Sequence, residues 1–252
     1  MDKKYIVANW KMNPQTLAEA EQILDYINDH FESRPETQLS LIVCPPFVFL
    51  DDIGKILQSS HLEHNSELGA QDIALAETGA WTGEVSGPML KRLGVQYVII
   101  GHSERRWKLG EPDEVVNKKL KTALGDELIP IVCIGERKRD KDFKAFLKQQ
   151  ITATFAGLSA DEVGKCLVAY EPVWAISSNP GAKPDTPEDT LQAIAVIKET
   201  LSQDTLVLYG GSVTSKNAKD FLSLADVAGV LVGGASIRKE EFVEILNIAE
   251  TI

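Results

Sequence analysis

The feature that most constrains the fold is a regular alternation of short apolar runs and helical segments along the whole chain. Most of the runs are continuously apolar, which is typical of parallel strands that are buried on both faces. The run near Glu67–Gln71 is the weakest, and its prediction depends on the rhythm of the others. The predicted strands are Tyr5–Asn9, Leu39–Cys44, Glu67–Gln71, Tyr97–Gly101, Ile129–Ile134, Leu167–Glu171, Leu206–Gly210 and Gly229–Gly233.

Helical signals lie between these runs. Thr16-Leu17-Ala18-Glu19 forms a capping box before apolar residues at helical spacing, and Thr186-Pro187 combines a cap with a proline in the first turn. Asp140–Ala156 and Lys239–Ile248 also have helical periodicity. Eight strands that alternate with helices predict an α/β fold, a (β/α)8 barrel that residues 1–252 form as one domain. An open doubly wound sheet is the rival fold, but no G-x-G-x-x-G follows the first strand.

Charge and composition limit the possible partners. The chain has 26 basic and 37 acidic residues, a net charge of −11, so it is a poor general binder of nucleic acid or of anionic membranes. Any phosphate must therefore be held by a local arrangement. No apolar run reaches the length of a membrane span, and Met1–Lys4 leads directly into a strand, so we expect neither a transmembrane helix nor a signal peptide.

The cysteines indicate a reducing compartment. Cys44, Cys133 and Cys166 all lie in apolar runs, and they are odd in number and without metal-ligand spacing. We expect reduced core residues and a cytoplasmic protein. His61 and His64 supply two potential ligands in a polar stretch, which predicts surface positions and no metal site.

Polar residues follow the strand ends. His102 comes directly after the fourth predicted strand, Glu171 ends the sixth, and Asn9 and Lys11 lie at the end of the first. The carboxyl ends of the strands in a parallel barrel meet at one rim, where active sites are built. The pattern predicts that His102 and Glu171 form a catalytic pair. The alternative is a core histidine and a glutamate in a structural ion pair.

Two glycine pairs predict a phosphate site. Gly210-Gly211 and Gly233-Gly234 end the last two predicted strands. Glycines let backbone N–H groups approach an anion closely, and the loops after strands seven and eight commonly bind phosphate in this fold. One pair alone is equally compatible with a tight turn. Two pairs in adjacent loops favour phosphate binding.

Several segments, in this order and spacing, resemble the triosephosphate isomerase family over nearly the whole chain. The resemblance implies a TIM barrel that interconverts dihydroxyacetone phosphate and D-glyceraldehyde 3-phosphate in glycolysis and gluconeogenesis, through an enediolate. It also implies a homodimer without a cofactor. The segments are Asn9–Asn13, Gly79–Glu84, Gly101–Arg106, Cys133–Glu136, Tyr170–Ile176, Tyr209–Val213 and Val232–Ser236.

The resemblance also assigns roles. Glu171 is the base, its basicity raised by burial, and His102 is the neutral electrophile for which this family is the standard example. Lys11 supplies positive charge and Asn9 a hydrogen-bond donor for the substrate oxygens. Further residues implied are the phosphate-binding amides of Ser177, Ser212, Gly233 and Gly234, the supporting residues Ser103 and Glu104, and the interface residues Thr78, Trp81 and Gln71.

The lid departs from the family pattern. The stretch Ile176–Pro187 is longer than usual, and Ser177 replaces the glycine whose amide meets phosphate. A barrel that binds a sugar phosphate without turnover, because its lid Ser177–Pro184 is altered, is therefore the alternative function. Another sugar-phosphate enzyme, such as an epimerase or a synthase, would use the glycine loops. It would not explain Asn9, Lys11, His102 and Glu171 together.

Overall fold

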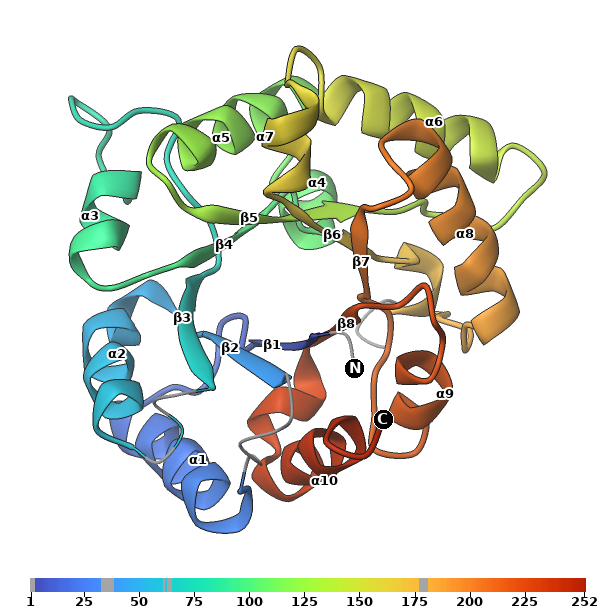
Figure 1. The fold of residues 1–252 in the computed structure, drawn as a ribbon. Coiled ribbons are helices and arrows are strands. Elements are labelled where there is room, and N and C mark those ends of the chain that lie inside the picture. The colour runs from blue at the N-terminus through green and yellow to red at the C-terminus, as the bar shows by residue number, and fades with distance from the viewer. Residues whose placement is uncertain (1–2, 33–38, 61, 63–64, 177–180) are drawn as a thin grey trace.

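The computed structural model describes residues 3–32, 39–60, 62, 65–176 and 181–252. Its parallel strands follow one another in sequence order and close into a barrel, and helices surround the barrel (Figure 1). The (β/α)8 fold is thereby confirmed. The strands are β1 (Lys4–Asn9), β2 (Leu39–Cys44), β3 (Ser66–Ala70), β4 (Tyr97–Ile100), β5 (Ile129–Ile134), β6 (Leu167–Tyr170), β7 (Leu206–Tyr209) and β8 (Gly229–Val232).

Helices connect each strand to the next. The α-helices are α1 (Leu17–His30), α2 (Leu50–Ser59), α3 (Gly87–Arg92), α4 (Ser103–Lys108), α5 (Asp113–Gly125), α6 (Phe143–Thr154), α7 (Ala160–Gly164), α8 (Pro187–Thr200), α9 (Ala218–Leu222) and α10 (Lys239–Ala249). Single 3-10 turns are η1 (Phe47–Phe49), η2 (Val173–Ala175) and η3 (Gly234–Ile237).

The helix starts predicted at Thr16 and Thr186 are confirmed. Thr16 caps α1 in a complete capping box with Glu19, and the Thr186 side chain accepts from the Asp189 N–H at the start of α8. The helix expected over Asp140–Ala156 is shorter and begins at Phe143, because Lys141 and Asp142 lie in a turn. Among the described residues, no helix is long and apolar enough to span a membrane.

The strand predictions hold to within about one residue. The weakest prediction is confirmed as Ser66–Ala70, and Gln71 leaves the ladder to donate to the Lys11 and Cys44 carbonyls. Like β3, four more strands end one residue earlier than expected, before Gly101, Glu171, Gly210 and Gly233. At Gly101 the reason is local, because its φ of 67° turns the chain out of the strand.

The core has two layers. One cluster fills the barrel interior and includes Cys44 and Cys133, and a larger one lies between the strands and the helices. Cys166 belongs to the outer cluster, and all three cysteines are free and buried. Burial raises the pKa of each thiol, which is consistent with structural residues.

A buried ionic cluster joins the segments that follow β3 and β4. Lys119 on α5 is 4% exposed, and its Nζ lies 2.7 Å from Asp72 Oδ2 and 2.6 Å from Glu111 Oε1. Arg105 on α4 contacts the same carboxylates, with Nε 2.9 Å from Asp72 Oδ2. Two cations balance two carboxylates, so the cluster is electrically closed. It fixes the loop after β3 against α4 and α5.

We expect Lys119→Met to lower the free energy of unfolding by about 3–5 kcal/mol, because it leaves two buried carboxylates with only Arg105. Denaturant titration at fixed protein concentration measures the change. Lys118→Met, on the exposed face one residue earlier, is the control and should change stability by less than about 0.5 kcal/mol. Equal effects of the two substitutions would show that the cluster does not stabilise the fold.

Candidate active site

His102 and Glu171 meet at the carboxyl rim of the barrel. His102 follows β4 and caps α4, and its Nδ1 accepts a hydrogen bond from the Glu104 N–H at 3.2 Å. An acceptor at Nδ1 places the ring proton on Nε2, which lies 2.9 Å from Glu171 Oε1. Both side chains are buried. The predicted pair is therefore in hydrogen-bonding contact, and the histidine donates from Nε2.

Glu171 is held as an ionised carboxylate. Burial acts to raise its pKa, but His102, the Ser103 N–H at 2.8 Å and the charge of Lys11 outweigh burial, and the pKa is lowered. The expectation that burial raises its basicity is therefore wrong for this arrangement. The sequence could not show how many donors would converge on the carboxylate. The carboxylate can accept a proton, but hydrogen bonds from His102 and the Ser103 N–H stabilise its ionised form and lower its basicity.

Two glycines make room for Glu171. A Cβ on Gly135 would lie 1.8 Å from the Glu171 carbonyl oxygen, and one on Gly210 would lie 3.0 Å from Glu171 Cγ. The Gly135 N–H donates to the buried Gln150 side chain at 2.9 Å, which fixes this close approach. Gly210 was expected to serve a phosphate loop. The structure places it against the Glu171 side chain.

Lys11 reaches the site from the loop after β1. Its φ is 56°, an uncommon left-handed conformation for a residue with a side chain. Asn9 Oδ1 accepts from the Lys11 N–H at 3.1 Å, and Gln71 donates to the Lys11 carbonyl, so both hold this backbone. Lys11 Nζ lies 3.1 Å from Glu104 Oε1, which matches the expected ion pair.

The glycine loops lie on the same rim. Gly233 is next to Lys11, since a Cβ there would be 3.3 Å from Lys11 Cε. Gly234 begins η3, and Ser212 follows the neighbouring strand β7. Gly211 accommodates the Tyr209 hydroxyl, because a Cβ would come within 2.2 Å of that oxygen. Ser177 lies outside the described residues, as do residues 178–180 of the lid.

Glu136 organises a network that sequence analysis missed. Its Oε1 accepts hydrogen bonds from the Tyr170 hydroxyl at 2.9 Å, Trp174 Nε1 at 3.0 Å and Arg139 Nη1 at 3.2 Å. Glu136 is buried, and it links β5, β6 and η2, which flank Glu171. The residue itself ends the segment Cys133–Glu136 that resembles the family, and it lies two residues after β5. Its partners could not be inferred from spacing.

The expected interface residues lie on an exposed loop. Thr78 is exposed, and Trp81 is 51% exposed in the isolated chain. Gln71 is half-buried and holds the loop after β1 from within the chain. Among the described residues, no group of three or more histidine, cysteine or acidic side chains is placed to hold a metal. His61 and His64 are outside the described residues.

Asp185 lies between the lid and the start of α8. It accepts hydrogen bonds from Thr190 Oγ1 at 2.7 Å and the Thr186 N–H at 2.8 Å. Burial nevertheless raises its pKa from 3.8 to about 6. Between these two values the folded protein keeps a proton that the unfolded chain has lost. Asp185 therefore stabilises the fold at acid pH, and this contribution is lost as the pH rises through about 6.

We expect Asp185→Asn to reduce the loss of stability between pH 5 and pH 8 by on the order of 1 kcal/mol, because partial exposure weakens the effect. Denaturant midpoints at the two pH values give the difference. Asp220→Asn, an exposed position on α9, should behave as the parent protein does. An unchanged pH dependence in Asp185→Asn would mean that Asp185 does not retain a proton in the folded state.

Comparison with known proteins places this geometry in a family. Residues 4–249 match the family model described as triosephosphate isomerase. A triosephosphate isomerase of Alkaliphilus oremlandii is 39% identical, covering 98% of this chain and all of that protein. One of Aquifex aeolicus is 40% identical over 97% of this chain and 98% of that protein, and one of Dictyoglomus turgidum is 38% identical over 98% and 100%. The chain belongs to the triosephosphate isomerase family.

Proposed function

We propose that this protein interconverts dihydroxyacetone phosphate and D-glyceraldehyde 3-phosphate. Family membership over residues 4–249 supports the reaction. The single observation that carries the assignment to residues is the 2.9 Å contact between His102 Nε2 and Glu171 Oε1, in a buried site that also contains Lys11. A carboxylate, a neutral imidazole and a fixed cation are the groups that proton transfer through an enediolate requires.

Glu171 is the base in this proposal. Its carboxylate takes a proton from the carbon beside the substrate carbonyl and returns it to the neighbouring carbon. Before substrate binds, His102 and the Ser103 N–H donate to the carboxylate and hold its pKa low. When substrate binds, His102 donates to the substrate and no longer to Glu171. The loss of this hydrogen bond raises the pKa of Glu171, so the carboxylate becomes a stronger base. Binding and activation of the base are thereby coupled.

His102 and Lys11 act on the oxygens. The Nε2–H of His102 turns from Glu171 to the carbonyl oxygen and stabilises the enediolate, then moves a proton between the two oxygens. Lys11 opposes the developing negative charge and the phosphate dianion, while its contact with Glu104 fixes its position. Asn9, held by its hydrogen bond to the Lys11 N–H, adds a donor to the same oxygens. No cofactor is part of this mechanism.

Backbone amides hold the phosphate. We assign Gly233 and Gly234 at the start of η3, Ser212 after β7, and Ser177 in the lid. This local cradle lets a chain with a net charge of −11 bind a dianion. The lid Ser177–Pro184 closes over the substrate and excludes water. The alternative is a non-catalytic barrel that binds a sugar phosphate, and it requires that the altered lid prevents turnover.

The decisive experiment has two steps. A coupled assay with the purified protein and glyceraldehyde 3-phosphate measures turnover, and we expect isomerisation. Glu171→Gln should fold normally but lose roughly a thousandfold or more in kcat, because an amide cannot accept the proton. Glu171→Asp is the matched control. It keeps a carboxylate but retracts it, so it should keep more activity than Glu171→Gln.

Each alternative result has a clear meaning. A parent protein that binds triose phosphate without turnover would support the non-catalytic barrel. Full activity in Glu171→Gln would place the base elsewhere on the rim.

We also propose that the active form is a cytoplasmic homodimer that serves glycolysis and gluconeogenesis. Large apolar side chains are exposed after three successive strands, β1, β2 and β3, and they need cover. They are Met12 at 84%, Val48 at 77%, Trp81 at 51% and Met89 at 54% exposed. A partner subunit would cover them together with Thr78 and the Gln71 side of the rim. Free buried cysteines support a reducing compartment.

Sedimentation velocity tests the assembly. We expect the parent protein to sediment as a dimer at micromolar concentration. Trp81→Glu should shift it toward monomer, because dimer formation would bury the new carboxylate without a cation to pair with it. Trp107→Glu, at an exposed tryptophan on α4, tests whether the effect is specific to the loop after β3. A parent protein that is monomeric and fully active at this concentration would overturn the dimer proposal.

A further inference from the structure

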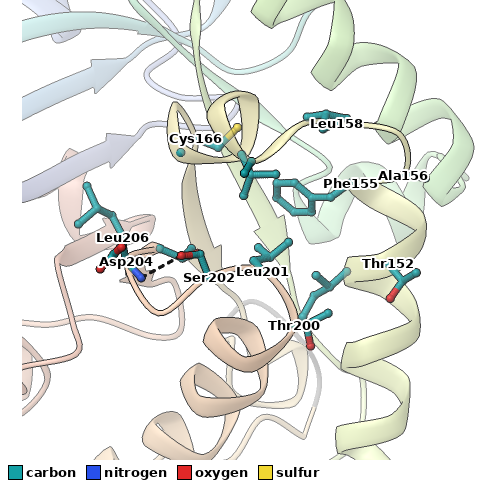
Figure 2. A pocket seen from close by; sticks show the side chains of 15 residues that line it. Thr152, Phe155, Ala156, Leu158, Cys166, Thr200, Leu201, Ser202, Asp204 and Leu206 are labelled. Atoms are coloured by element: carbon teal, nitrogen blue, oxygen red, sulfur yellow. Dashed lines mark hydrogen bonds between the residues drawn. The ribbon is translucent and has the colours of Figure 1, made fainter.

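A pocket lies at the amino-terminal end of the barrel, away from the active site. It is formed by the end of α6, by α7, by Cys166 just before β6, and by the loop from α8 to the start of β7 (Figure 2). His102, Glu171 and the glycine loops all follow the carboxyl ends of strands. The pocket therefore belongs to the opposite end of the barrel and is independent of the proposed function.

The walls of this pocket are mainly apolar. Figure 2 shows Phe155, Leu158 and Leu201 arranged around it, and Val163 and Leu206 complete the apolar lining. Leu206 is the first residue of β7, and it is 43% exposed, although strand residues of this barrel are otherwise mostly buried. Leu158, Val163 and Leu201 are also only partly buried. A ligand that covers these side chains would remove apolar surface from water.

The space suits a small molecule. The cavity has a volume of about 630 Å³, within the usual range for ligand sites. Gly164 is one of the lining residues, and a Cβ on it would meet nothing within 4 Å. Replacing Val163 or Gly164 by a large residue would fill the space.

The polar groups of the pocket select against anions. Hydroxyls come from Thr152, Thr200 and Ser202, and one exposed carboxylate comes from Asp204. Among the residues that the structure describes, no lysine, arginine or histidine lines the pocket. Thr205 also lines it, is 8% exposed, and its Oγ1 has no hydrogen-bond partner in the described structure. An anionic group would face Asp204 without a cation to balance it, whereas an ammonium group would pair with Asp204.

Cys166 contributes to the wall without reacting. Its Sγ lies 3.3 Å from the Glu162 carbonyl oxygen, to which the thiol donates. Burial raises the pKa of the thiol to about 12, so the reactive thiolate is scarce at neutral pH. A ligand in this pocket is therefore held without a covalent bond.

From these observations we propose that the pocket between α6, α7 and the α8–β7 loop is a binding site for a small amine with an apolar body. The apolar body packs against Phe155, Leu158, Val163, Leu201 and Leu206, and the ammonium group pairs with Asp204. Triose phosphates are dianions without an apolar part, so this site does not take the substrate or product of the proposed reaction.

Methyl NMR of protein labelled at leucine and valine tests the proposal with three probes of one size: benzylamine, benzyl alcohol and benzoate. Benzylamine should give saturable shifts at Leu158, Val163, Leu201 and Leu206, with a dissociation constant on the order of 1 mM for so small a ligand. Benzyl alcohol should bind roughly two- to fivefold more weakly. Benzoate should give no saturable shift.

Matched variants locate the binding. Val163→Trp fills the pocket and should abolish the shifts at Leu158, Leu201 and Leu206, whereas Val163→Ala keeps it open and should retain them. Asp204→Asn should weaken benzylamine roughly two- to fivefold and leave benzyl alcohol unchanged, while Asp161→Asn, an exposed carboxylate outside the pocket, should alter neither. The proposal is overturned if the benzylamine shifts do not saturate, or if benzylamine binds Val163→Trp as tightly as it binds the parent. It is also overturned if benzoate binds the parent as tightly as benzylamine does, or if benzylamine binds Asp204→Asn as tightly as it binds the parent.

Discussion

The rest of the structure depends on closure of the barrel between its last and first strands. β8 pairs with β1 in parallel, with Gly229 opposite Tyr5, and the Tyr5 N–H donates to the Ala228 carbonyl at 2.9 Å. A Cβ on Gly229 would lie 1.9 Å from the Tyr5 carbonyl oxygen, so the seam closes because this residue has no side chain. Closure leaves no sheet edge, and it brings the loops after β1 and β8 together. Lys11 and Gly233 become neighbours for this reason.

The chemistry of the site follows from how its charges are arranged rather than from their sum. The chain is strongly acidic, yet Glu104 and Glu171 are each matched within the site by Lys11, His102 or a backbone N–H. His102 has a hydrogen-bond acceptor role at Nδ1 and a donor role at Nε2, which lets it act while neutral. Glu171 is kept ionised by donors that a substrate can displace. In the proposed function, this local balance is what lets an acidic protein bind and process a dianion.

The two ends of the barrel carry different kinds of feature. The carboxyl end holds features that do not favour stability at neutral pH: the left-handed backbone of Lys11 and the raised pKa of Asp185. Buried networks around Arg105, Lys119 and Glu136 support this end. At the amino-terminal end, the pocket between α6, α7 and the α8–β7 loop is lined mostly by apolar side chains. A ligand bound in this pocket would not contact the residues at the carboxyl rim.

The sequence by itself determined the barrel, because buried parallel strands read as continuous apolar runs and because caps such as Thr16 and Thr186 act locally. It also determined that His102 and Glu171 would meet, since parallel strands bring their carboxyl ends to one rim. Only the tertiary structure decided the rest. The direction of the Glu171 pKa, the partners of Glu136, and the close approach of Gly135 and Gly210 to Glu171 all arise between segments distant in sequence. Whether such a contact forms depends on differences in atomic position of a few tenths of an ångström. The spacing of residues along the chain does not encode differences of that size.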